Sequence, residues 1–139
     1  MEAIHLGPDK AGELTAVDEA RAVAGKGLEG DRKFHAHGAK PGQALTLVEA
    51  ENVDDAGLPA GGTRRQVTVR GVRLNDLIGK RFRVGEVECY GVELCEPCLH
   101  LESMTRPGLI KDLVHRAGIN ADILNDGVIR VGDRVDELP

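Results

Sequence analysis

The sequence predicts a mainly β protein, with one β-barrel domain over residues 1–139 and a few short peripheral helices. Eighteen glycines lie between short runs of β-branched residues, a pattern typical of strands joined by tight turns. Hydrophobic residues make up 41% of the 139 residues, which is enough for a core without disulfides. Apolar and polar residues alternate most clearly in Gln66–Arg70 and Val128–Val131.

Strands are predicted where β-branched residues are bounded by turn residues. In chain order the predicted strands are Glu2–Leu6, Ala16–Ala22, Gln43–Val48, Gln66–Arg70, Arg81–Val84, Val87–Val92, Ala121–Leu124, Gly127–Val131 and Arg134–Leu138. Asn125–Gly127 is predicted as a hairpin turn, because Asn and Gly tolerate positive φ.

The predicted helices are short. They cover Glu49–Ala56, a single turn at Leu74–Ile78, Leu99–Met104 and Leu109–His115. Gly79 stops the single turn, and Pro107 separates the last two helices because proline cannot continue a helix. Residues 57–63 are predicted as a loop.

Composition argues against several classes of protein. The aromatic residues are Phe34, Phe82 and Tyr90, so the core is expected to be aliphatic and stacking on nucleic-acid bases is poorly provided for. The net charge of -5 also opposes binding to phosphate backbones, so we expect no nucleic-acid partner. No signal peptide and no membrane-spanning apolar run are visible, and three cysteines do not make a disulfide framework. We therefore expect a cytoplasmic protein with free thiols and no membrane contact.

Charge is segregated along the middle of the chain. Residues 64–83 carry seven Lys or Arg and one acid, a net charge of +6, whereas residues 84–103 carry five acids and no Lys or Arg. One interpretation is that two solvated strand faces complement each other across a sheet. The other is a basic rim that binds a phosphorylated small ligand, since arginine offers bidentate donors to phosphate.

The pair Cys95-Glu96-Pro97-Cys98 is the strongest chemical signal, and it lies between a predicted strand and a predicted helix. Thioredoxin-like exchange is one reading, although alternating βαβ units are missing. A zinc site is a second, although a second Cys-X-X-Cys is missing and histidines such as His35 and His37 would have to complete it. A third is one soft thiolate that binds a heavy metal or carries sulfur, and a fourth is a pair of inert buried cysteines. Cys89 is assigned to the core because it lies inside an alternating strand.

Several motifs in the same order resemble the MOSC domain family, the module also found at the C-terminus of molybdenum-cofactor sulfurases. The motifs are Leu28-Glu29-Gly30-Asp31-Arg32, Arg64-Arg65-Gln66-Val67, Leu74-Asn75-Asp76-Leu77-Ile78-Gly79, Cys95-Glu96-Pro97-Cys98 and Gly127–Asp133. The family fold is a β-barrel, in agreement with the fold predicted from the residues.

The resemblance implies binding of the molybdenum cofactor (molybdopterin). Cys98 corresponds to the family cysteine that supplies a thiolate to molybdenum or carries sulfur as a persulfide. Arg32, Arg64 and Arg65 correspond to basic residues that contact the cofactor phosphate. Gln66 departs from the family pattern, in which Asn is common. Larger reductase members carry an additional N-terminal barrel domain, for which these 139 residues have no room.

Three functions follow as hypotheses. The first is a molybdenum-cofactor-binding oxidoreductase that reduces N-hydroxylated small molecules through Cys98 and takes electrons from a separate reductase. The second is a sulfurtransferase in which Cys98 holds a persulfide supplied by a cysteine desulfurase. The third is non-catalytic, either a cofactor carrier or a structural zinc barrel. In each of these hypotheses except the structural zinc barrel, the expected partner is a small-molecule substrate or cofactor.

Overall fold

The computed structural model describes residues 1–7 and 12–139. Its strands are β1 (Ala3–Leu6), β2 (Thr15–Val17), β3 (Glu19–Val23), β4 (Gly27–Leu28), β5 (Leu45–Glu49), β6 (Val67–Val69), β7 (Arg81–Val84), β8 (Val87–Leu94), β9 (Ile119–Ile123), β10 (Gly127–Arg130) and β11 (Val135–Glu137). Its helices are α1 (Ala50–Asp55), α2 (Leu99–Met104) and α3 (Leu109–Leu113), with one 3₁₀ turn, η1 (Leu74–Leu77).

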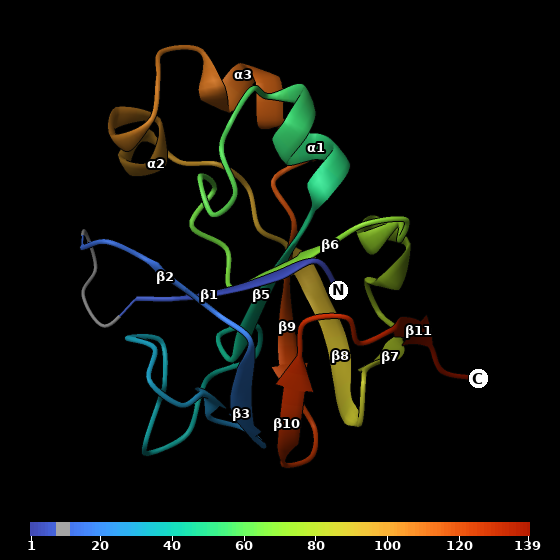
Figure 1. The fold of residues 1–139 in the computed structure, drawn as a ribbon. Coiled ribbons are helices and arrows are strands. Elements are labelled where there is room, and N and C mark those ends of the chain that lie inside the picture. Colours follow the sequence, from blue (N-terminus) through green and yellow to red (C-terminus); the bar gives the residue numbers. More distant parts are fainter. Residues whose placement is uncertain (8–11) are drawn as a thin grey trace.

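The strands form a strongly curled sheet, which confirms the prediction of a mainly β fold (Figure 1). Eight strands follow the order β11-β7-β8-β9-β5-β6-β1-β2 and make half a barrel, and β10-β3-β4 form a second sheet. Within the described residues, β5 and β6 are the one pair of these strands that runs parallel. A parallel pair needs a crossover, which α1 and the loop after it provide. Figure 1 shows α1, α2 and α3 gathered at one end of the sheet.

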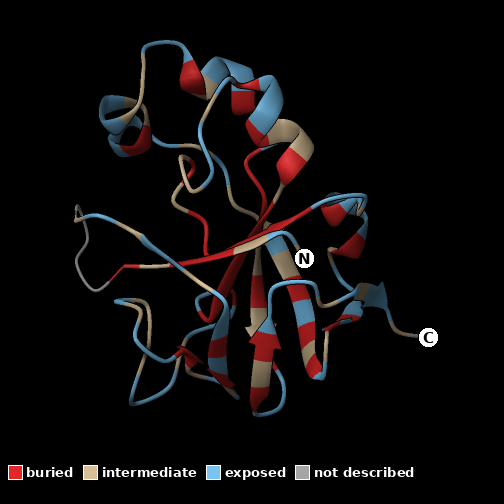
Figure 2. Ribbon diagram, in the orientation of Figure 1, coloured by how far each residue is buried: buried red, intermediate tan, exposed pale blue. Residues whose placement is uncertain are grey.

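The core is aliphatic, as the composition predicts. Phe82 is the largest fully buried side chain, and the residues around it are mostly Val, Leu, Ile and Ala. Figure 2 shows buried and more exposed residues alternating along β8 and β10, as expected for strands with one covered face. The helices have a small apolar cluster of their own, made of Ala56, Leu101, Leu109, Leu113 and Ala117.

The predicted strand at Ala16–Ala22 is in fact two strands. The chain bends at Asp18, so that β2 pairs with β1 in the large sheet while β3 pairs with β10 and β4 in the small one. The run of β-branched and small residues does not show where a strand changes sheets. The two-residue strand β4 was not predicted, because it is too short to show alternation.

The predicted hairpin at Asn125–Gly127 is wrong. In the described strand pairs, β9 lies between β8 and β5, and β10 pairs with β3. Asn125 Oδ1 instead accepts the Glu88 N–H at 2.8 Å, and Asp126 Oδ1 accepts the Ala24 N–H at 2.8 Å. These side chains bind the backbone of neighbouring segments, which is the other common role of Asn and Asp in turns.

The charged segments confirm the interpretation of complementary strand faces for part of their length. Arg81 and Arg83 on β7 form ion pairs with Glu88 on β8, at 2.6 and 3.1 Å. Hydrogen bonds from Arg81 and Arg83 lower the pKa of Glu88. Arg64 and Arg65 lie before β6, outside these ion pairs between β7 and β8. Among the described residues, no helix is long and apolar enough to cross a membrane.

Candidate functional site

The cysteine segment connects β8 to α2. The Cys95 N–H donates to the Gly118 carbonyl at 2.8 Å, which holds the start of the segment beside the strand β9. Cys98 has extended backbone angles and is the N-cap of α2, where its Sγ accepts the Leu101 N–H at 3.5 Å. Cys95 is half-buried and Cys98 is exposed. The segment therefore presents one thiol to the surface at the start of a helix.

Cys98 opens into a cavity of about 260 Å³ that also holds the three predicted arginines. The cavity is lined by Arg32, Lys33, Arg64, Arg65, Cys98, His100 and Leu101. These residues come from the turn after β4, the segment before β6 and the segment leading into α2. The fold thus brings together the four residues for which the sequence predicts a site.

Arg32 is placed by the turn that Asp31 stabilises. Asp31 Oδ1 accepts the Gly7 N–H at 2.8 Å, and Oδ2 accepts the Lys33 N–H at 3.1 Å. Gly30 has φ +88, a left-handed conformation that favours glycine. Asp31 is thus a structural residue that fixes the turn, and the exposed Arg32 side chain projects from it.

Gln66 connects this turn to the main sheet. Its Nε2 donates to Asp31 Oδ2 at 2.9 Å, and its Oε1 accepts the Thr46 N–H at 2.9 Å. Both Gln66 and Thr46 are buried, so these hydrogen bonds satisfy groups that would be costly to leave unpaired. In this chain, the residue that departs from the family pattern holds the arginine turn against β5.

Arg65 lines the cavity but is buried, with 8% of its surface exposed. Its guanidinium donates to the carbonyl oxygens of Ala117 at 2.9 Å, Cys95 at 3.0 Å, Thr63 at 3.4 Å and Glu96 at 3.4 Å. These hydrogen bonds leave little donor capacity for a ligand.

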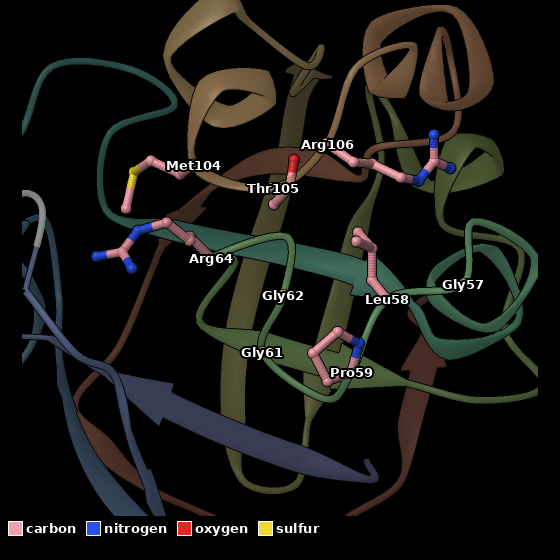
Figure 3. Close-up of a pocket in the computed structure, with 9 residues that line it drawn as sticks. All are labelled: Gly57, Leu58, Pro59, Gly61, Gly62, Arg64, Met104, Thr105 and Arg106. Carbon is pink, nitrogen blue, oxygen red and sulfur yellow. The ribbon is translucent and has the colours of Figure 1, made fainter.

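Arg64 has a positive φ of 62°, which is uncommon for a residue other than glycine and costs backbone energy. Its Nη2 donates to the Gly12 carbonyl at 2.9 Å. Arg64 also lines an adjoining cavity of about 450 Å³, in which Figure 3 shows Arg64 and Met104 on the same side and Arg106 pointing away from them. The strained residue therefore lies where two cavities meet.

Lys33 is a site residue that the motif analysis missed, although it follows Arg32 directly. Burial lowers the pKa of Lys33, and the neighbouring Arg32 and Arg65 act in the same direction, while Cys95 and Asp31 oppose them. In the part of the chain that the structure describes, Arg32, Lys33 and Arg65 form no ion pair with an acid. Arginines on other faces do, as Arg70 does with Glu2 and Asp54. Among the described residues, the cavity thus brings together the positive charges of Arg32, Lys33 and Arg65 without a direct ion pair to any of the three.

Arg32 and Lys33 also line another cavity, of about 370 Å³. Cys95, His35 and Asn120 lie in its wall. His37 is exposed. The two cysteines of the pair therefore line two cavities that share a basic turn. His100 is exposed and lines the cavity of Cys98.

The structure also bears on the third cysteine, Cys89, and on the interpretation of the cysteine pair as part of a zinc site. Cys89 is fully buried, which raises the pKa of its thiol to about 12, and this confirms its assignment to the core. Among residues 1–7 and 12–139, no group of three or more His, Cys, Asp or Glu side chains is placed to hold a metal ion. The described residues therefore offer no ligand set of the kind a structural zinc site uses.

Comparison with known proteins identifies the family of this chain. The family model of the MOSC domain matches residues 2–136. The chain belongs to the MOSC domain family, as its motifs predict. It is therefore a domain of the molybdenum-cofactor-sulfurase type, and no curated protein matches it.

Solved structures show the same fold at low sequence identity. The YuaD protein from Bacillus subtilis aligns with a TM-score of 0.79 and 18% identity, over 98% of this chain and 93% of that one. YiiM from Escherichia coli aligns with a TM-score of 0.72 and 17% identity, over 100% of this chain and 70% of that one. YiiM from Geobacillus stearothermophilus has a TM-score of 0.72 and 19% identity, over 99% of this chain and 73% of that one.

Proposed function

We propose that this protein binds the molybdenum cofactor, with Cys98 as the protein ligand of the metal and the basic turn as the site of the cofactor phosphate. The observation that carries the proposal is the cavity in which an exposed thiol meets Arg32, Lys33, Arg64 and Arg65. A soft thiolate suits a heavy transition metal, and arginine suits a phosphate. The side chains present therefore fit both ends of this cofactor.

The neighbouring cavities supply the space that the cofactor needs. A cavity of about 260 Å³ is small beside the ~300–1,000 Å³ of typical ligand pockets. It adjoins the cavity of about 370 Å³ through Arg32 and Lys33, and the cavity of about 450 Å³ through Arg64. These shared lining residues support the proposal that a ligand larger than the central cavity extends into the neighbouring ones.

The proposed activity is the reduction of N-hydroxylated small molecules, with electrons from a separate reductase. The cofactor, when bound, supplies the redox chemistry. This chain supplies the thiolate of Cys98, the cations of Arg32 and Lys33 that orient an anionic group, and Arg64, which lines both the central cavity and the cavity of about 450 Å³.

Replacement of Cys98 by serine tests the proposal cleanly. Serine is a favoured N-cap residue, so Cys98→Ser keeps the start of α2 while it removes the soft ligand. We expect anaerobically purified wild type to contain molybdenum and pterin, and to reduce N-hydroxylated bases when an electron donor is present. Cys98→Ser should lose the metal and the activity, whereas the matched variant Cys95→Ser should keep both. Wild type without molybdenum or pterin, even after loading, would refute the proposal.

The exposure of Cys98 favours a second candidate function, a sulfur carrier. A persulfide must reach both its donor and its acceptor, and an exposed thiol at a helix start is accessible to a partner protein. Incubation with a cysteine desulfurase and cysteine should then add the mass of one sulfur atom to wild type and to Cys95→Ser, but not to Cys98→Ser. Intact-mass spectra without that adduct would exclude this function.

A further inference from the structure

Arg65 joins three segments that are distant in the sequence. It precedes β6, and its guanidinium binds the Ala117 carbonyl before β9 and the Cys95 and Glu96 carbonyls after β8. A fourth hydrogen bond reaches the carbonyl of Thr63 in its own segment. The side chain is buried by the residues it binds.

The acceptors of Arg65 are all backbone oxygens. No carboxylate of the described residues forms an ion pair with it, so its charge is balanced by carbonyl dipoles. Such an arrangement fixes main chain rather than side chains, because each carbonyl that is bound restrains the peptide to which it belongs. Two consecutive carbonyls of the cysteine segment are held in this way.

Further contacts of Cys95 and Glu96 complete the restraint. The Cys95 N–H donates to the Gly118 carbonyl at 2.8 Å, and Glu96 Oε1 accepts the His115 N–H at 2.7 Å. Pro97 then limits the backbone just before Cys98. Together with the hydrogen bonds of Arg65, these contacts restrain residues 95 and 96 just before Cys98.

We propose that Arg65 is a positioning residue that holds the cysteine segment so that the Cys98 thiol faces the cavity, and that it acts on the cofactor mainly through Cys98 rather than as a phosphate ligand. The last clause of this inference rests on the proposed function, because it assumes that the cofactor binds at Cys98. Arg64, the neighbouring arginine, donates to the Gly12 carbonyl at 2.9 Å and provides the matched control.

Hydrogen exchange of wild type, Arg65→Lys and Arg64→Lys tests the role without any cofactor. Lysine keeps the charge but cannot reach several carbonyls with a planar fork. Arg65→Lys should speed amide exchange at Cys95, whose N–H donates to the Gly118 carbonyl, by about tenfold or more, and leave β1 and β3 unchanged. Arg64→Lys should leave exchange at Cys95 at the wild-type rate. Equal exchange at Cys95 in all three proteins would overturn the inference.

Side-chain NMR of wild type gives a reading that does not depend on whether a variant folds. A guanidinium held by carbonyls should show a protected Nε–H and slowly rotating Nη groups for Arg65. A freely rotating, unprotected guanidinium would contradict the inference. In Arg65→Ala, added methylguanidinium should restore slow exchange at Cys95, which a general loss of packing would not allow.

The cofactor-loaded protein separates this inference from the proposed function. X-ray absorption should show fewer sulfur ligands on molybdenum in Arg65→Lys than in wild type, with pterin content retained. Pterin lost from Arg65→Lys, with the exchange rate of the Cys95 amide unchanged, would make Arg65 a direct ligand instead. Wild type without pterin would defeat the proposed function and leave the exchange experiment as the test of the backbone restraint.

Discussion

His5 is buried in β1, with an exposed fraction of 7%. Among the described residues, its Nδ1 atom has no hydrogen-bond partner. Burial lowers the pKa of His5 below its ordinary value of 6.5, so the folded protein disfavours the charged form. His5 lines a cavity of about 350 Å³ together with Glu13 and Arg64. The unfavourable burial of its imidazole therefore lies next to an arginine of the candidate site.

The sign of the pH effect follows from that direction. The unfolded chain binds a proton at His5 more readily than the folded one, so stability falls as the pH drops below the unfolded value of ~6.5. We expect the urea midpoint of wild type to be lower at pH 5.5 than at pH 7.5. The difference should shrink in His5→Gln, and it should persist in His37→Gln, which changes an exposed histidine. An equal pH dependence in wild type and His5→Gln would contradict this account.

At the scale of elements, two backbone segments pack very closely at Gly118, just before β9. Gly118 has φ +104, and a Cβ there would lie 1.9 Å from the Leu47 carbonyl oxygen of β5. The same glycine accepts the Cys95 N–H, so its close approach to β5 also sets the place of the cysteine segment.

A pair of alanine substitutions separates crowding from backbone strain. Gly132 also has a positive φ, of 98°, but nothing lies within 4 Å of a Cβ placed there. Gly132→Ala should therefore cost only about 1–2 kcal/mol of unfolding free energy, from the left-handed backbone. Gly118→Ala adds a collision with backbone and should cost more than about 3 kcal/mol. Chemical denaturation would measure both, and equal losses would contradict the crowding at Gly118.

The elements themselves were largely predictable, and the reasons differ between cases. Alternation located β6 and β10, and Pro107 separated α2 from α3, because both signals are local. The bend at Asp18 and the pairing of β10 with β3 were not predictable, since they depend on which sheet a strand joins. The cysteine and the arginines of the cavity were predicted from motifs. The backbone role of Arg65 was not, because the carbonyls that it binds belong to segments distant in sequence.

At the scale of the whole molecule, many of the described arginines pair with an acid, whereas Arg32, Lys33 and Arg65 form no such pair among the described residues. Arg21, Arg81 and Arg116 lie on different segments, and each pairs with an acid. Lys33 lies half-buried beside Arg32 and Arg65 without such a pair among the described residues. In a protein with a net charge of -5, this local excess attracts an anion against the average field.

Binding of a small polyanion should therefore stabilise the fold. Pyrophosphate, as a probe of the phosphate site, should raise the thermal midpoint of wild type above that in chloride of equal ionic strength. A ligand at ~100 times its Kd adds ~2.7 kcal/mol. The gain should be lost in Lys33→Met and kept in Lys111→Met, which removes an exposed lysine of α3. A gain that survives in Lys33→Met would place the anion elsewhere.

The three-way contact of Arg65 also has a consequence for synthesis on the ribosome. Arg65 emerges 30 residues before Cys95 and 52 residues before Ala117. Arg65 can therefore form all of these hydrogen bonds only after the ribosome has made the cysteine segment and Ala117, which lies just before β9. Until then Cys95 and Cys98 belong to an unfinished chain in which the fold does not yet hold their segment in place.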